Sequence, residues 1–107
     1  MLDVMTSLRM LEQRTEDAVH AQPSPDAAVG LGVEARNLGA ILGTTPDLAS
    51  GGIRDRALLL THHGEELARA ALTGQAERLA GILRELEADT HELRGALEAA
   101  DRDRTKG

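Results

Sequence analysis

The residue best placed for chemistry is His91, which lies in the stretch EADTHELRGAL at 87–97. In a helix, Glu87 would lie one turn before His91 and Arg94 about one turn after it, on one strip of the surface. At about 100° per residue this strip points about 130° away from the leucine stripe of the same segment, so His91 would face solvent. An exposed imidazole could accept a phosphoryl group from another protein, while a nearby guanidinium contacts the phosphoryl oxygens. The spacing therefore indicates phosphotransfer as one use of His91 and Arg94.

The motif HELRGAL resembles the phosphorylation box of sensor histidine kinases, in which His-Glu-Leu-Arg is usually followed by Thr-Pro-Leu. It is also similar to the His-x-Leu-Lys-Gly signature of histidine phosphotransfer domains, with Arg94 at the lysine position and Gly95 matching. The resemblance implies that His91 is the phosphoacceptor, Glu92 an acid/base helper and Arg94 the phosphoryl contact. It covers seven residues, and both families place a further core helix after the histidine, where 16 residues remain here. Phosphotransfer is therefore the alternative to a solvated histidine on a Glu/Arg-rich helix.

A second kind of chemistry is metal binding, because His62 and Glu66 have the same four-residue spacing as Glu87 and His91. Histidine and glutamate on facing helices hold iron or manganese in bundle proteins, and they also suit zinc. These ligands would have to face inward, whereas the helical count turns His62 and His91 outward. An early methionine with a late histidine would also suit haem. We therefore expect no cofactor, with a metal- or haem-binding bundle as the second alternative.

Composition removes several other classes of function. The 107 residues contain no Phe, Tyr, Trp or Cys, and acids outnumber bases 18 to 12 for a net charge of −6. Nucleic acid and anionic membranes are disfavoured as partners by this charge, and single-stranded nucleic acid also by the lack of stacking rings. Disulfides and thiolate sites are excluded. We expect a cytoplasmic protein, and the Ala/Arg/Gly/Leu bias is typical of GC-rich bacteria.

Helical periodicity recurs four times and no stretch alternates with a period of two, which predicts an all-α chain. The third segment runs to the turn Thr73-Gly74, so it should form a tight hairpin with the fourth. In the fourth segment the apolar residues repeat every seven positions, and acidic pairs such as Glu85 and Asp89 are expected on solvated faces. The stripe of this segment comprises Leu79, Leu86, Leu93 and Ala100 with Leu83, Thr90 and Leu97 between them. We predict one antiparallel four-helix domain over 1–107, with a frayed tail at 101–107.

The second segment, about 25–43, contains four glycines, at positions 30, 32, 39 and 43. Glycine inside a helix costs roughly 1 kcal/mol relative to alanine. The first interpretation is a marginal helix held by its neighbours. The alternative is a helix that uses small residues to approach another helix closely. Ser24, followed by Pro25, is a good start for this helix.

The function we expect from the sequence is non-enzymatic protein–protein interaction by a small adaptor, chaperone-like or regulatory bundle. A core without aromatic rings buries little apolar area per residue, so association with a second copy would stabilise it. We therefore expect a homodimer. The candidate contact residues are those that widen the apolar stripes beyond one face, namely Leu58, Leu59, Leu72 and Ile82.

Overall fold

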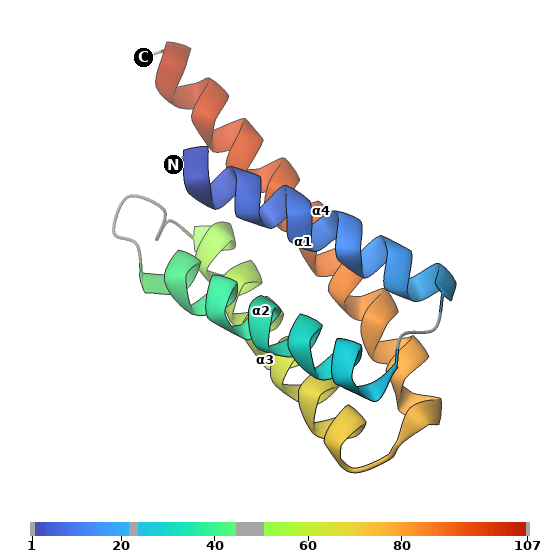
Figure 1. Ribbon diagram of the computed structural model, residues 1–107. Coiled ribbons are helices and arrows are strands. Elements are labelled where there is room, and N and C mark those ends of the chain that lie inside the picture. Colours follow the sequence, from blue (N-terminus) through green and yellow to red (C-terminus); the bar gives the residue numbers. More distant parts are fainter. Residues whose placement is uncertain (1, 22–23, 45–50, 107) are drawn as a thin grey trace.

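The computed structural model describes residues 2–21, 24–44 and 51–106, all but four of them in four helices (Figure 1). Helix α1 spans Leu2–Ala21, α2 spans Pro25–Thr44, α3 spans Gly51–Leu72 and α4 spans Ala76–Lys106. No strand occurs in these ranges. The prediction of an all-α four-helix bundle is confirmed.

The helix ends follow from local chemistry. At the start of α2 the hydroxyl of Ser24 accepts a hydrogen bond from the backbone N–H of Ala27 at 3.2 Å, as a helix cap does. At the end of α3 Gly74 takes a left-handed φ of 71°, a conformation that costs other residues energy. The N–H of Gln75 then donates to the carbonyl of Ala70 at 2.9 Å, which closes the α3–α4 turn. The predicted tight hairpin is confirmed.

The sequence predicts a break after the second helix, with a short helical turn beginning at Thr45-Pro46-Asp47. This stretch lies outside the described residues. The frayed tail predicted at 101–107 is instead helical as far as Lys106, so α4 has 31 residues and projects past the start of α1 (Figure 1). Basic residues are frequent between 102 and 106, and cations favour the C-terminal end of a helix. This charge distribution helps to explain the extension.

The core is a set of leucines that all four helices turn inward. Most of the predicted stripe of α4 is buried, including Leu86, Leu93 and Leu97, while Leu79 and Ala100 at its ends are partly buried. Two threonines lie among the leucines, and each satisfies its hydroxyl within its own helix: Thr15 donates to the carbonyl of Leu11 at 2.7 Å and Thr90 to that of Glu87 at 3.0 Å. The aromatic-free core is therefore filled by aliphatic side chains and self-satisfied polar ones.

Helices α2 and α3 pack backbone against backbone. A Cβ at Gly32 would lie 2.6 Å from the carbonyl oxygen of Gly64, and one at Gly39 would lie 2.7 Å from the carbonyl oxygen of Ala57. Such distances leave no room for any side chain. For these two glycines the first interpretation, a merely marginal helix, is wrong, and close approach over small residues is correct. Gly30 differs, because a Cβ there meets nothing within 4 Å.

The four helices form two layers, with α1 packed on α4 and α2 packed on α3 (Figure 1). The α3–α4 hairpin joins the layers on one side, while α1 and α2 have the weakest contact of the four neighbouring pairs. The described helices include none that is long and apolar enough to cross a membrane. The tight α2–α3 packing leaves the side of α3 that faces away from the core uncovered.

Candidate interaction surfaces

The outer side of α3 carries two large exposed apolar residues at heptad spacing. The side chains of Leu58 and Leu72 lie two heptads apart, and these residues are 60% and 75% exposed. His62, Glu65 and Arg69 fall between them at steps of four and three residues, so all five share one face of the helix. All five are exposed. We call these five residues the outer seam.

The four predicted contact residues do not form one surface. Leu59 is exposed but turned about 100° from Leu58, so it lies off the outer seam. Ile82 is only 5% exposed and belongs to the core, so the expectation that it is a surface contact is wrong. The reason is that α4 packs against both α1 and α3, which buries a wider arc than a single stripe.

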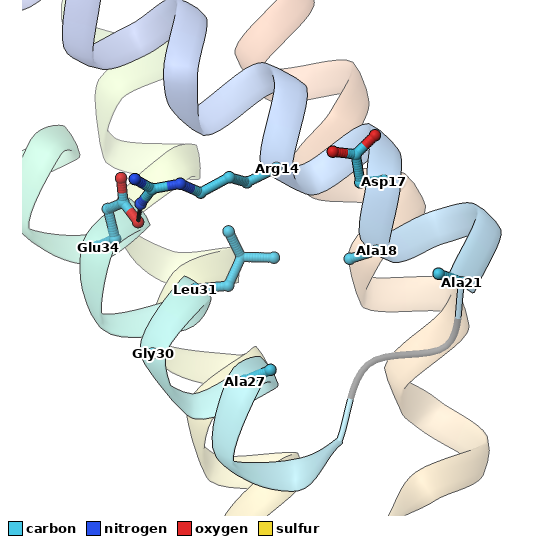
Figure 2. A pocket seen from close by; sticks show the side chains of 8 residues that line it. All are labelled: Arg14, Asp17, Ala18, Ala21, Ala27, Gly30, Leu31 and Glu34. Atoms are coloured by element: carbon cyan, nitrogen blue, oxygen red, sulfur yellow. Dashed lines mark hydrogen bonds and ion pairs between the residues drawn. The ribbon is translucent and has the colours of Figure 1, made fainter.

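A second apolar surface is the groove between α1 and α2 (Figure 2). Its lining includes Ala18 and Ala21 from α1 and Ala27, Gly30 and Leu31 from α2. Most of these residues offer at most one methyl group each. An arriving side chain would therefore find less apolar area here than on the leucines of the outer seam.

Charged side chains border this groove. Arg14 reaches from α1 across to the carboxylate of Glu34 on α2, with which it forms an ion pair (Figure 2). Asp17 of α1 also lines the groove and accepts a hydrogen bond from the amide of Gln13 at 3.1 Å. The Arg14–Glu34 pair links the two neighbouring helices with the weakest contact, which gives these side chains a structural role.

His91 is exposed on α4, as the sequence predicts, and the Nη2 of Arg94 lies 3.4 Å from its Nδ1, but the same guanidinium is engaged by two carboxylates. The Nε of Arg94 lies 2.9 and 3.0 Å from the two carboxylate oxygens of Glu12 on α1, and its Nη1 lies 3.2 Å from Glu98. These two carboxylates raise the pKa of Arg94 above its already high ordinary value. Arg94 therefore links α4 to α1 through its ion pair with Glu12.

Glutamates outnumber arginines around His91. Its Nδ1 lies 3.7 Å from a carboxylate oxygen of Glu12, and Glu16, Glu87 and Arg84 line the same shallow groove between α1 and α4. Carboxylates repel a phosphoryl group, and the nearest guanidinium is already neutralised. This arrangement does not favour the phosphoacceptor role that the resemblance implies for His91.

The predicted metal ligands are not brought together. His62 and Glu66 form an ion pair with each other at 2.8 Å on the exposed side of α3. His91 faces Glu12 of α1, as described above, and the described part of the chain contains no group of three or more His, Asp or Glu side chains placed to hold a metal ion. The geometry thus offers no support for the metal-binding alternative.

A polar cluster that the sequence did not predict lies between α3 and α4. The Nδ1 of His63 contacts the carboxylate of Asp89, and the Nε2 of the same ring lies 3.1 Å from Glu85. Asp89 is buried, which corrects the expectation that it faces solvent beside Glu85. Burial raises the pKa of Asp89 above its ordinary value, and the hydrogen bond and charge of His63 partly oppose this.

The arrangement of the His63–Asp89 cluster suits a structural role rather than a metal site. The two carboxylates lie on opposite nitrogens of one ring, so they cannot share a metal ion with it. The sequence could have indicated that Asp89 is buried, because it lies between Leu86 and Leu93 and next to the inward-facing Thr90. A carboxylate in that position needs a partner on the facing helix, and His63 supplies one.

Comparison with known proteins identifies no relative. No protein-family model matches the chain, and no curated protein and no solved structure shows significant similarity to it.

Proposed function

We propose that this chain is a non-enzymatic interaction module, a small adaptor or regulatory helical bundle that binds another polypeptide through the outer seam of α3. The observation that carries the proposal is the exposure of Leu58 and Leu72 on one face of a well-packed helix. Removing a leucine side chain from water is worth about 1.5–3 kcal/mol when burial is complete. A partner that covers both residues would gain a substantial part of that free energy.

The opposite side of α3 supports this proposal. Gly64 of α3 lies against α2, and Leu60 and Leu67 are fully buried in the core. The inner side of α3 therefore supplies most of its packing within one copy, and the leucines of the outer seam, which are 60% and 75% exposed, contribute little to it. Paired apolar residues at helical spacing are the anchors that helices use when they bind other helices.

We further propose that the protein works in the cytoplasm of a bacterium. The acidic, cysteine-free composition suits a reducing compartment, and the residue bias suits a GC-rich genome.

The test is site-specific photocrosslinking in the cells that make the protein. A photoreactive amino acid replaces Leu58 or Leu72 in turn, and Ser7, an exposed polar position on α1, serves as the matched control. We expect discrete protein adducts from positions 58 and 72 that are absent from position 7. Equal labelling from all three positions, or none from any of them, would contradict the proposed function.

A further inference from the structure

The order of residue types along the outer seam is the same in both directions of the chain. From Leu58 through His62, Glu65 and Arg69 to Leu72, the order is leucine, basic, acidic, basic, leucine. If two such helices lie antiparallel with their Glu65 residues at the centre, Leu58 of each copy faces Leu72 of the other. Two apolar pairs then flank a polar centre, and both copies present the same surface, as a twofold interface requires.

Charges at the centre of this pairing are complementary. In the antiparallel register, Arg69 of one copy lies about one helical turn from Glu65 of the other. His62, which contacts Glu66 of its own helix at 2.8 Å, lies at the matching position on the other side of Glu65. Arg69 of the second copy is therefore the cation that offsets the repulsion between the two glutamates.

The charge of the whole helix favours the same surface. Helix α3 has three arginines, at 54, 56 and 69, and three acids, at 55, 65 and 66. Within the helical spans that the structure describes, α1, α2 and α4 each have more acids than bases. Two copies of a protein with a net charge of −6 repel each other least where the facing helices are neutral.

The surface beside Leu72 has room for an incoming side chain. A shallow hollow between α2 and α3 runs along the outer seam there, and its lining includes Gly64, Ala68 and Leu72 with Val33 of α2. The hollow exists because the glycine contact draws the two helices together without filling the space outside it. Leu58 of a second copy would arrive at this position in the antiparallel register.

We propose that the partner of the outer seam is a second copy of this chain, bound with the two α3 helices antiparallel and Glu65 at the twofold axis; this rests on the proposed function. Two heptads of one helix bury less than the roughly 1,200 Å² typical of stable complexes. The dimer is therefore weak and depends on concentration.

The test is sedimentation equilibrium of the purified full-length protein over a range of concentrations. We expect the wild type to shift from monomer to dimer, and Leu72→Glu to weaken the dimer by about tenfold or more. Arg69→Glu should weaken it too, whereas the double variant Glu65→Arg/Arg69→Glu should restore it, because the exchanged charges still face each other. Arg84→Glu, the same charge change on an exposed residue of α4, is the matched control. Urea unfolding checks that each variant remains folded.

A wild type that stays monomeric at every concentration overturns this inference. A dimer that persists in both Leu72→Glu and Arg69→Glu also overturns it, because another surface must then be in contact. If the purified protein is monomeric while positions 58 and 72 crosslink to a different protein in cells, the proposed function stands and only the second copy is wrong. If those positions also give no specific adducts, both fail.

Discussion

The imidazole of His63 on α3 is held against the buried carboxylate of Asp89 on α4, 26 residues later in the chain. This pair lies on the inner side of the hairpin, whereas the outer seam of the same helix faces solvent. Helix α3 thus contacts α4 through the His63–Asp89 pair, contacts α2 through glycine, and exposes a pair of leucines on the outer seam. The three features can be tested separately.

The buried Asp89 should make stability depend on pH. Its pKa is raised in the folded protein above the ordinary value of 3.8, chiefly by burial, so the folded chain holds this proton more tightly than the unfolded one. The contribution of Asp89 to the free energy of unfolding, compared with that of an uncharged residue at the same position, must then fall as pH rises from 3.8 through the raised pKa. We expect the free energy of unfolding of wild type, relative to Asp89→Asn, to fall over this range. Urea unfolding at a series of pH values measures it.

Replacing His63 sharpens this test. His63 lowers the pKa of Asp89, so His63→Gln should raise that pKa and move the loss of stability to higher pH. Comparing His63→Gln with His63→Gln/Asp89→Asn also removes imidazole titration from the measurement. Asp55→Asn, an exposed acid of α3, is the matched control. A difference that stays flat, or rises with pH, would show that Asp89 is not buried against α3.

Two glycines of α2 should respond oppositely to the same substitution. Gly39→Ala places a methyl group against the backbone of α3, so we expect it to lower the free energy of unfolding by about 1–3 kcal/mol. Gly30→Ala places the same methyl group in open space and should raise stability by up to roughly 1 kcal/mol. Urea unfolding of the two variants is the measurement. Similar effects from both would contradict the close approach of α2 and α3.

The ion pair between Arg94 and Glu12 should contribute measurably to the α1–α4 contact. Their side chains are 26% and 20% exposed, and the guanidinium contacts both carboxylate oxygens. A double-mutant cycle with alanine at both positions should give a coupling of about 1 kcal/mol. Arg14 and Glu34, which are 53% and 35% exposed and share no partner with Arg94, provide the comparison and should couple less. Equal couplings would mean that burial does not strengthen the Arg94 pair.

His91 should not accept phosphate. The three glutamates in the groove around it and the engagement of Arg94 by Glu12 both oppose an incoming phosphoryl group. Incubation with a phosphorylated response-regulator domain, followed by acid and base treatment, should therefore leave no acid-labile phosphate on the chain. His91→Gln is the control. Labelling of the wild type that this variant abolishes would restore the phosphotransfer interpretation.

Much of the fold was predictable from the sequence because its signals are local. Leucines at helical spacing, Ser24 before Pro25 and Gly74 at the hairpin turn each act within a few residues. They predict four helices and the tight α3–α4 connection without knowledge of the packing.

What could not be predicted depends on which helices meet. A helical wheel assumes one buried stripe, whereas α4 contacts two helices, so the wider buried arc also takes in Ile82 and Asp89. Likewise, Gly30 and Gly39 have the same intrinsic helix propensity, and the presence of Ala57 and Thr61 of α3 opposite Gly39 makes their roles different. On the site, Leu58 and Leu72 were predicted correctly as exposed residues, but the His63–Asp89 pair was missed.

The most direct test of the outer seam as a binding surface is disulfide crosslinking, since the chain has no cysteine of its own. Leu58→Cys and Leu72→Cys are oxidised separately and as a mixture. In the antiparallel pair, residues 58 of the two copies would lie about 21 Å apart, too far for a disulfide, while 58 and 72 face each other. We predict that the mixture forms a 58–72 linked dimer faster than either variant alone. Equal slow crosslinking in all three samples would contradict the account.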